Sequence, residues 1–213
     1  MDDLFAELDD GAPQELAAGV VLLRGFVREQ ASLLLAVAQI TQAAPFRQMS
    51  TLGGYVMSVE MSNCGALGWI ADCHGYRYVA HDPLTGEPWP AMPEAFLALA
   101  RRAALEAGFA NFSPDVCLIN RYVPDTKLSM HQDKDEADFS APIVSVSLGL
   151  PAVFVLGGLQ RNDPSQRIGL SHGDVLVWGG PARLRYHGVL ALKHGNHAQL
   201  GACRINLTFR QAA

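Results

Sequence analysis

At 213 residues, the chain is long enough to bury a hydrophobic core as one domain, 1–213, without disulfide bonds or a structural metal. Hydrophobic residues make up 49% of the sequence and charged residues 17%, a composition that excludes disordered and fibrous proteins. The formal net charge of -5 at pH 7 argues against broad electrostatic binding to a nucleic-acid backbone, although a local basic groove is compatible with it.

Targeting signals and cysteine motifs are not visible in the sequence. The longest apolar runs are too short to span a bilayer, and the acidic start Met1–Glu7 differs from the basic start of a secretory leader. The four cysteines are Cys64, Cys73, Cys117 and Cys203. They lie far apart without a CxxC pair, which argues against a zinc finger or a dithiol redox motif. We therefore expect a cytoplasmic protein with reduced thiols and no membrane anchor.

The first half of the chain predicts an arm, a short strand and two helices. Residues Met1–Gly19 are acidic and interrupted by Gly and Pro, so we expect a loosely held arm there, before a strand at Val20–Leu23. Apolar residues recur at helical spacing over Arg28–Ala44, and the proline that follows ends the pattern. A second helix is predicted over Pro93–Gly108, with proline in its first turn and glycine at its end.

The segment Phe46–Trp89, between these helices, is rich in Gly, Met and aromatic residues and has no long helical period. Gly53-Gly54 predicts a turn, and Tyr55–Met61 alternates as a strand would. The aromatic residues beyond it form either a satellite packing cluster or a surface on which a flat ligand stacks. Taken alone, the segment favours the packing cluster; a metal site further along the chain would favour the stacking surface.

Short strands dominate the second half of the chain. Each is bounded by Pro, Gly or Asp, and the predicted strands are Val116–Tyr122, Ile143–Leu148, Val153–Leu156, Val175–Trp178 and Ile205–Phe209. Helices come first and strands follow, without an alternating strand and helix rhythm. We therefore predict an α+β protein with a mainly β core, an antiparallel double-sheet barrel of the jelly-roll type covered by the early helices.

A candidate metal site lies in the stretch Leu128–Asp135. His131 and Asp133 are two residues apart, so in an extended segment their side chains point the same way, together with that of Asp135. His187 is the best-placed third ligand downstream. Two His and one carboxylate are typical of non-haem Fe(II) oxygenases, but a bare HxD pattern also arises by chance in polar surface loops.

A candidate anion site lies on the last strand. Its polar face consists of Arg204, Asn206, Thr208 and Arg210, while the alternate residues are apolar. Arginine presents a planar fork of donors that matches a carboxylate, so this face predicts a barrel interior that receives a dicarboxylate. Asn120 and Tyr122 share a face by the same count. The alternative is a solvated strand face.

With these motifs in order along almost the whole chain, the sequence resembles the AlkB family of Fe(II)- and 2-oxoglutarate-dependent dioxygenases. The matching segments are Asn120–Tyr122, His131–Asp133, Pro142–Gly149, Gly173–Gly180, His187 and Arg204–Arg210. The resemblance implies a double-stranded β-helix core at about 115–213 and a nucleotide-recognition lid at about 46–90. Two stretches depart from the family pattern, Ile70–His74 and Lys193–Ala202.

Residue by residue, the resemblance implies three groups of site residues. The iron ligands would be His131, Asp133 and His187. Arg204 would pair with the distal carboxylate of 2-oxoglutarate, in a pocket completed by Asn120, Tyr122, Asn206 and Arg210. Trp69 would stack on the damaged base opposite His131, and Asp135 would contact an exocyclic nitrogen. The positions that hold the substrate backbone or base would be Tyr76, Arg77, Tyr78 and Arg161.

The resemblance also implies a reaction, the oxidative dealkylation of N-alkylated bases such as 1-methyladenine and 3-methylcytosine. It would use O2, decarboxylate 2-oxoglutarate and release an aldehyde, acting on single-stranded DNA, with RNA as a further substrate, as a monomer. Stacking and a few phosphate contacts would suit an acidic protein that binds a short single strand. The alternatives are an oxygenase of RNA, protein or small molecules, a non-catalytic nucleic-acid binder, and a metal-dependent isomerase or hydrolase of the cupin type.

Overall fold

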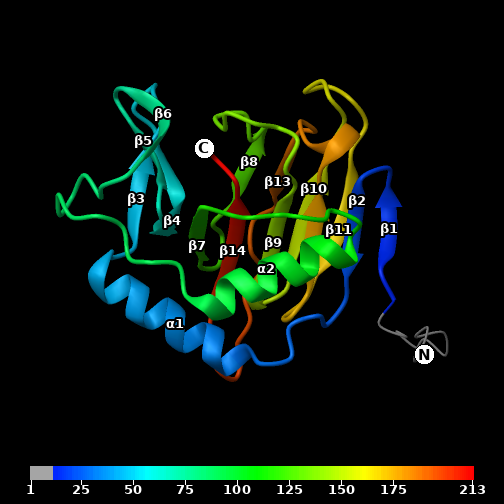
Figure 1. Ribbon diagram of the computed structural model, residues 1–213, viewed down its shortest axis with the longest axis horizontal. Helices are drawn as coiled ribbons and strands as arrows, with labels where there is room; N and C mark the ends of the chain where they lie inside the picture. Colours follow the sequence, from blue (N-terminus) through cyan, green and yellow to red (C-terminus); the bar gives the residue numbers. More distant parts are fainter. Residues whose placement is uncertain (1–11) are drawn as a thin grey trace.

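The computed structural model describes residues 12–213 as two antiparallel sheets, a separate hairpin and two helices (Figure 1). In spatial order, the larger sheet contains β1 (Gln14–Ala17), β2 (Val20–Leu23), β12 (Val175–Trp178), β9 (Ile143–Gly149), β14 (Arg204–Arg210), β7 (Val116–Tyr122), β4 (Val56–Gly65) and β3 (Arg47–Ser50). The smaller sheet contains β11 (Gln166–Leu170), β10 (Ala152–Leu156), β13 (His187–Val189) and β8 (Leu128–His131). The hairpin consists of β5 (Gly68–Asp72) and β6 (Gly75–Val79).

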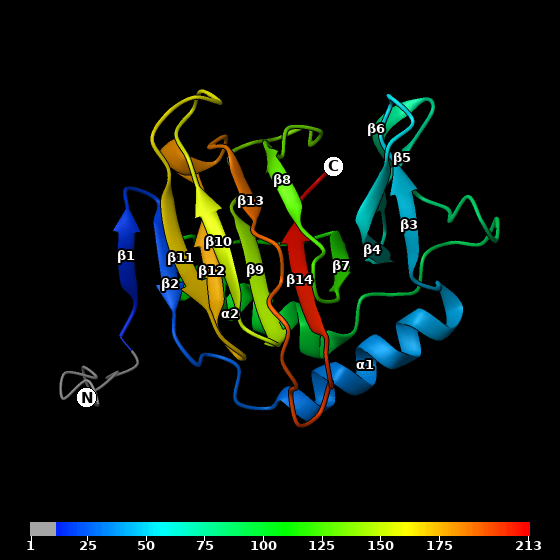
Figure 2. The same ribbon diagram turned by 180° about the vertical axis from the view of Figure 1, so that it is seen from behind.

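Two helices, α1 (Gln30–Ala43) and α2 (Glu94–Glu106), cover the outer face of the larger sheet (Figures 1 and 2). Their apolar sides pack on that sheet; for example, Phe96 of α2 meets Phe209 of β14 edge to face, with ring centroids 5.8 Å apart. Both helices begin and end within two residues of their predicted bounds. Over residues 12–213, neither helix combines the length and the apolar character that crossing a membrane requires.

The last strand, β14, separates the apolar core under the helices from the space between the sheets. Ile205, Leu207 and Phe209 pack toward the helices. The alternate residues Arg204, Asn206, Thr208 and Arg210 line a cavity between the two sheets instead. The predicted polar barrel interior and the predicted fold class are therefore confirmed.

The N-terminal prediction is wrong for part of its range. Gln14–Ala17 forms β1, which pairs antiparallel with β2 rather than lying as a loose arm. Residues 1–11 of that predicted arm lie outside the described part of the chain. The strands missing from the sequence prediction are β5, β6, β11 and β13, which are short or lack clear alternation. Strand β3 is the extended piece expected before the Gly53-Gly54 turn, and it pairs with β4 after that turn.

Some aromatic residues of the segment Phe46–Trp89 pack in the core, and others form a surface on which a flat ligand could stack. Trp89 is buried and donates its indole N–H to the Val79 carbonyl at 2.9 Å, as a packing residue does. Trp69 and Tyr76 stand on the hairpin with their rings 5.7 Å apart and nearly parallel, at an interplanar angle of 10°. Both line the cavity between the sheets. Packing and stacking surfaces therefore coexist in one segment.

Candidate active site

Two neighbouring strands of the smaller sheet bring together residues that lie far apart in the sequence. β8 ends at His131 and β13 begins at His187, and the antiparallel register pairs these two residues directly. Their imidazole rings lie 4.4 Å apart. Asp133 follows just beyond the end of β8, where its carboxylate reaches both rings.

The three side chains direct their ligating atoms toward one another. Nε2 of His131 lies 3.5 Å from Oδ1 of Asp133, and Nε2 of His187 lies 3.4 Å from Oδ2. All three ligating atoms lie within 4.8 Å of one another. Two imidazole nitrogens and one carboxylate at these separations can bind a divalent metal on one side and leave its other positions open.

Backbone carbonyls fix the orientation of both imidazoles. Nδ1 of His131 lies 2.8 Å from the Ser129 carbonyl, and Nδ1 of His187 lies 3.0 Å from the Arg185 carbonyl. A carbonyl oxygen only accepts hydrogen bonds, so Nδ1 must carry the proton in each ring. The Nε2 lone pairs are therefore free to bind a metal, an arrangement common among metal-binding histidines.

Asp133 is buried but remains ionised because of its neighbours. Nη2 of Arg210 donates to its Oδ2 at 2.8 Å. Burial alone would raise the pKa of Asp133, but the charge of Arg210, together with the two neighbouring imidazoles, outweighs burial and holds that pKa well below its ordinary value. Burial and the nearby charge of His131 lower the pKa of His187, which favours the neutral, ligating form of the imidazole. The site therefore offers a metal one negative charge and a neutral nitrogen.

A second layer of hydrogen bonds connects this site to the hairpin. The Tyr78 hydroxyl accepts from Nη1 of Arg210 at 3.0 Å and donates to Oε1 of Glu136 at 2.7 Å. Glu136 in turn forms a buried ion pair with Arg183 at 3.1 Å. Burial and the neighbouring Glu136 carboxylate raise the pKa of Tyr78, with the nearby Arg210 charge opposing them, so the hydroxyl stays protonated. Strand β6 is thus linked through Arg210 to Asp133.

Arg204 lies at the inner end of the cavity as an incompletely paired cation. Its side chain is only 1% exposed, with Nη2 donating to the Ser147 hydroxyl at 3.0 Å and the guanidinium 4.9 Å from the centre of the Tyr122 ring. Nε and Nη1 have no hydrogen-bond partner among residues 12–213. Leaving buried charged donors unpaired is costly, so this arrangement is that of a receptor for an anion.

The other polar residues of this pocket are held by the barrel. The Asn206 amide donates to the Ser145 hydroxyl at 2.8 Å and accepts from Thr208 at 3.0 Å. Oδ1 of Asn120, one strand away on β7, is buried without a hydrogen-bond partner. Burial raises the pKa of Tyr122, so its hydroxyl is neutral. The pocket therefore offers neutral polar groups around one fork of positive charge.

The cavity has a volume of about 620 Å³. The structure places twelve of the sequence-predicted site residues along it: Trp69, Tyr76, Asn120, Tyr122, His131, Asp133, Asp135, Arg161, His187, Arg204, Asn206 and Arg210. Arg77 and Tyr78 do not line it. Arg77 forms an ion pair with Asp72 at 2.8 Å within the hairpin, and the Tyr78 hydroxyl contacts Arg210.

The mouth of the cavity combines aromatic and charged groups. The Trp69 indole N–H donates to Oδ2 of Asp135 at 2.9 Å, while its ring stacks with that of Tyr76. Arg161 reaches the mouth from the opposite side and donates to the Met130 carbonyl at 2.9 Å. A flat ring would meet an oriented indole here, with a carboxylate beside it.

Sequence reasoning missed several residues of the mouth. Thr51 and Tyr55 from the turn between β3 and β4, and Met57 at the start of β4, line the cavity, as do Lys127 and Lys134 near β8. Tyr55 is 79% exposed, and its neighbours Leu52 and Val56 are exposed as well, so several apolar side chains face solvent at this turn, as they do at many binding surfaces. Its place beside the Gly53-Gly54 turn was the available signal, because an aromatic residue at a turn is poorly placed for core packing.

Gly188 allows the close approach of β13 to β8 that aligns the two histidines. A Cβ at this position would lie 2.7 Å from the Leu128 carbonyl oxygen. We expect Gly188→Ala to separate the strands, displace His187 and lower metal affinity by about 10- to 100-fold, as changes around metal ligands commonly do. Titration with Fe(II) or Co(II) measures this effect.

Gly169→Ala is the matched control for this substitution. Gly169 lies on β11 of the same sheet, and a Cβ there meets nothing within 4 Å. It should keep the metal affinity of the original chain. Equal metal affinities for Gly188→Ala and Gly169→Ala would contradict the role given to the strand contact.

Comparison with known proteins places this site in a family. Residues 19–210 match the family model described as the 2OG-Fe(II) oxygenase superfamily. The chain is 60% identical to alpha-ketoglutarate-dependent dioxygenase AlkB of Salmonella typhimurium, over 100% of this chain and 99% of that protein. The chain belongs to the AlkB family of 2OG-Fe(II) oxygenases.

Further comparisons agree with this AlkB-family assignment. The chain is 57% identical to AlkB of Escherichia coli strain K12, over 100% of this chain and 98% of that protein. Its fold is similar to the solved structure of OsALKBH1, with a TM-score of 0.82 and 31% sequence identity over 93% of this chain and 99% of that one. This AlkB-family chain is therefore a dioxygenase that uses Fe(II), 2-oxoglutarate and O2.

The side chains of this AlkB-family site fit both groups. The two Nε2 atoms and the Asp133 carboxylate make the donor set that non-haem Fe(II) prefers. The unpaired donors of Arg204, buried at the inner end of the same cavity, match the distal carboxylate of 2-oxoglutarate. The cavity thus has one place suited to the metal and another suited to the cosubstrate.

Proposed function

We propose that this enzyme removes N-linked alkyl groups, of the kind found in 1-methyladenine and 3-methylcytosine, from single-stranded DNA, with RNA as a further substrate. The observation that carries the proposal is the oriented Trp69 ring at the mouth of the cavity that contains the His131, Asp133 and His187 group. AlkB-family enzymes act on alkylated nucleic acids, and a stacking ring beside the metal site suits a base as the reacting group.

The shape and charge of the cavity support a single-stranded substrate. A base can reach groups inside a closed cavity only after it leaves the stack, which is easiest in a single strand. Lys127, Lys134 and Arg161 line the cavity and can contact phosphates, although the chain as a whole is acidic. A local basic rim with an aromatic platform is typical of single-strand binding.

We assign the residues of the site the following roles. His131, Asp133 and His187 would hold Fe(II), and Arg204 would bind the distal carboxylate of 2-oxoglutarate, with Asn120, Tyr122, Asn206 and Arg210 around it. When bound, these groups supply the chemistry by which 2-oxoglutarate is oxidatively decarboxylated and the N-alkyl carbon hydroxylated, after which an aldehyde leaves. The chain contributes binding, orientation and exclusion of water, and no protein nucleophile is needed.

The substrate contacts follow from the mouth of the cavity. Trp69 would stack on the base, and Asp135, which the indole N–H orients, would accept a hydrogen bond from an exocyclic nitrogen. Tyr76 and Arg161 would hold the neighbouring backbone or base. Arg77 and Tyr78 would act indirectly, Arg77 through Asp72 and Tyr78 through Arg210.

The segment at about 46–90 would serve as the nucleotide-recognition lid of a single domain, 1–213, whose catalytic core lies at about 115–213. In Figures 1 and 2, strands β3 to β6 stand together at the end of the molecule opposite β1. The monomeric state and the cytoplasmic location stay predictions. Light scattering during size-exclusion chromatography measures the first, and cell fractionation the second.

The decisive experiment follows the mass of a single-stranded oligonucleotide with one 1-methyladenine, together with succinate and formaldehyde. We expect the loss of one methyl mass, dependent on both Fe(II) and 2-oxoglutarate. Succinate without demethylation would keep the dioxygenase and discard the proposed lesion. Lesion-independent binding without either product would favour a non-catalytic nucleic-acid binder.

Trp69→Ala tests the base contact. Stacking of a base on an aromatic ring contributes about 1–3 kcal/mol, so we expect the KM for the oligonucleotide to rise about 5- to 150-fold. Metal affinity should stay unchanged, because Trp69 is not among the grouped ligands.

Trp69→Phe is the matched control. It keeps an aromatic face but loses the N–H that donates to Asp135. A KM close to that of the original chain would assign the effect to stacking, and a KM equal to that of Trp69→Ala would assign it to the hydrogen bond with Asp135. An unchanged KM in both variants contradicts the proposed contact.

A further inference from the structure

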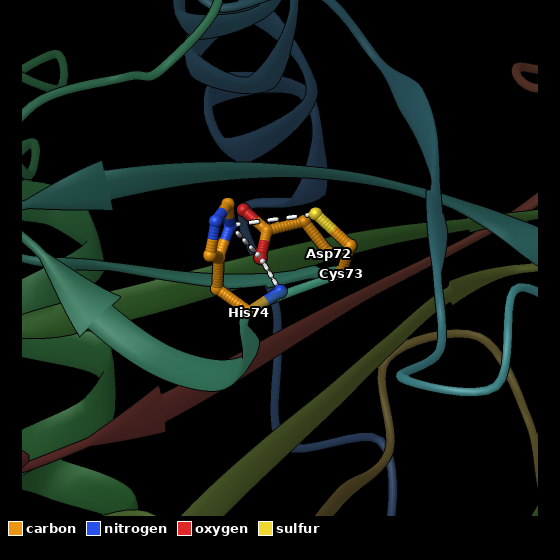
Figure 3. A group of neighbouring side chains, drawn as sticks. All are labelled: Asp72, Cys73 and His74. Carbon is orange, nitrogen blue, oxygen red and sulfur yellow. Dashed lines mark hydrogen bonds and ion pairs between the residues drawn. The ribbon is translucent and has the colours of Figure 1, made fainter.

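A second group of possible metal ligands lies at the tip of the hairpin formed by β5 and β6. Asp72, Cys73 and His74 turn their carboxylate, thiol and imidazole toward one another there (Figure 3). Their ligating atoms lie within 4.8 Å of one another. None of the three residues lines the cavity that contains the His131, Asp133 and His187 group, so this group is separate from the catalytic site.

Two distances in this group are close to those of a tetrahedral zinc site. Sγ of Cys73 lies 3.4 Å from Nδ1 of His74, and that nitrogen lies 3.5 Å from Oδ1 of Asp72. Usual Zn–S, Zn–N and Zn–O bond lengths at tetrahedral angles give edges of about 3.6 Å for S···N and about 3.4 Å for N···O. Both distances that involve the His74 imidazole therefore match those around one bound ion to within a few tenths of an ångström.

The hairpin holds the carboxylate of this group in place. Oδ1 of Asp72 accepts the His74 backbone N–H at 2.8 Å, and Arg77 donates to both carboxylate oxygens, each at 2.8 Å. The Arg77 hydrogen bond, followed by the His74 backbone bond, holds the pKa of Asp72 below its ordinary value, so the carboxylate is ionised. Gly75 completes the tight turn: it pairs with Asp72 across the hairpin, and its φ of 104° is one that glycine adopts without strain.

The accessible thiol is the independent feature that identifies the class of ion. Cys73 is a free and exposed cysteine, and the His74 side chain is 77% exposed, so an ion can reach both. A thiolate with an imidazole selects borderline metals such as Zn²⁺ over Mg²⁺ or Ca²⁺, which prefer oxygen ligands alone. The catalytic group, with two imidazoles and a carboxylate, contains no sulfur.

We propose that Asp72, Cys73 and His74 form a second metal site, which binds a zinc-class divalent cation with three protein ligands and water. The site lies within the hairpin that carries Trp69 on one strand and Tyr76 on the other. An ion bound at the tip fixes the turn that joins these two stacked rings.

Cobalt(II) distinguishes this site from the catalytic one, because only a thiolate ligand gives a sulfur-to-cobalt charge-transfer absorption in the near ultraviolet. We titrate the full chain, reduced with a phosphine, with Co²⁺ and record this absorption. We expect one equivalent of the absorption in the original chain and its complete loss in Cys73→Ser. In a Zn²⁺ titration that competes with a chromophoric chelator, Cys73→Ser should bind one equivalent of Zn²⁺ fewer than the original chain.

The matched control is Cys203→Ser, a partly buried cysteine far from the hairpin tip in sequence, which should keep the absorption. His74→Ala should weaken Co²⁺ binding measurably while all variants keep the circular dichroism of the original chain. Absence of the charge-transfer absorption, its persistence in Cys73→Ser, or an unchanged affinity in His74→Ala would each overturn the proposal. So would a ratio of two chains to one ion, which would place the metal between copies.

Discussion

Asp133→Ala is expected to abolish both succinate formation and demethylation. Asp133 is the one carboxylate of the catalytic group and contacts Nε2 of both His131 and His187, at 3.5 and 3.4 Å. Replacing a residue that only orients a metal ligand lowers metal affinity by about 10- to 100-fold. Replacing a ligand itself should therefore lower metal affinity by more than ~100-fold. Anaerobic Fe(II) titration and succinate formation together measure the loss.

The same substitution is expected to destabilise the protein. Asp133 is also the partner of the buried Arg210, and removing it leaves a buried cation with one hydrogen-bond acceptor fewer. Breaking a buried ion pair by removing one partner costs roughly 3–5 kcal/mol. Asp133→Asn, which keeps the shape but not the charge, should show a smaller loss of thermal stability and a similar loss of turnover.

Asp135→Asn provides the control two residues away. Asp135 lines the cavity mouth and accepts from Trp69, but it does not belong to the grouped metal ligands. The variant should therefore bind Fe(II) normally and still form succinate without substrate, while its activity on the methylated oligonucleotide changes. Full turnover by Asp133→Ala, or loss of Fe(II) binding by Asp135→Asn, would remove the ligand assignment.

Residues on regular strands were the most predictable part of this site. Alternation on β14 predicts that Arg204 and Arg210 share a face, and β7 places Asn120 and Tyr122 by the same rule. The period of two fixes which residues share a face. It does not say whether the polar face points into the barrel or toward the helices. That followed from the opposite face of β14, which is fully apolar and packs against the helices.

The choice of His187 could not be derived from periodicity. β13 is three residues long, and its register with β8 includes an irregularity between His187 and Val189. A strand of this length carries no alternation signal, and the pairing depends on contacts between segments far apart in the chain. The sequence offered His187 only as the best-placed downstream candidate among its seven histidines, and the resemblance to a family then supported that choice.

The hairpin shows a second limit of sequence reasoning. Tyr76, Arg77 and Tyr78 are consecutive, yet they have three different surroundings: the cavity, an ion pair with Asp72, and the buried Arg210. Alternation would place Tyr76 and Tyr78 on one face. The buried acceptor Glu136 and the donor Arg210 bind the Tyr78 hydroxyl, and neither partner is near it in sequence.

Arg204→Met is expected to raise the 2-oxoglutarate concentration needed for half-maximal turnover by at least about 30-fold. Truncating one partner of a buried, hydrogen-bonded charge pair costs roughly 2–5 kcal/mol, and each 1.4 kcal/mol is about tenfold. Nε and Nη1 of Arg204 have no protein partner, so they are available to the cosubstrate. Arg204→Lys should also bind weakly, because it keeps the charge but loses the planar fork.

Without cosubstrate, Arg204→Met should be at least as stable as the original chain. The guanidinium is buried with one hydrogen bond, to Ser147, and replacing an incompletely paired buried charge by an apolar side chain of similar length is often stabilising. A ligand that binds only the folded state raises its stability, so 2-oxoglutarate should raise the melting temperature of the original chain and leave that of the variant almost unchanged. Thermal unfolding with and without 2-oxoglutarate, in the presence of a redox-inactive divalent metal, measures both effects. An equal rise in melting temperature in the two proteins would show that Arg204 does not bind the cosubstrate. A lower melting temperature of the variant without ligand would show that the guanidinium stabilises the fold through contacts other than its hydrogen bond.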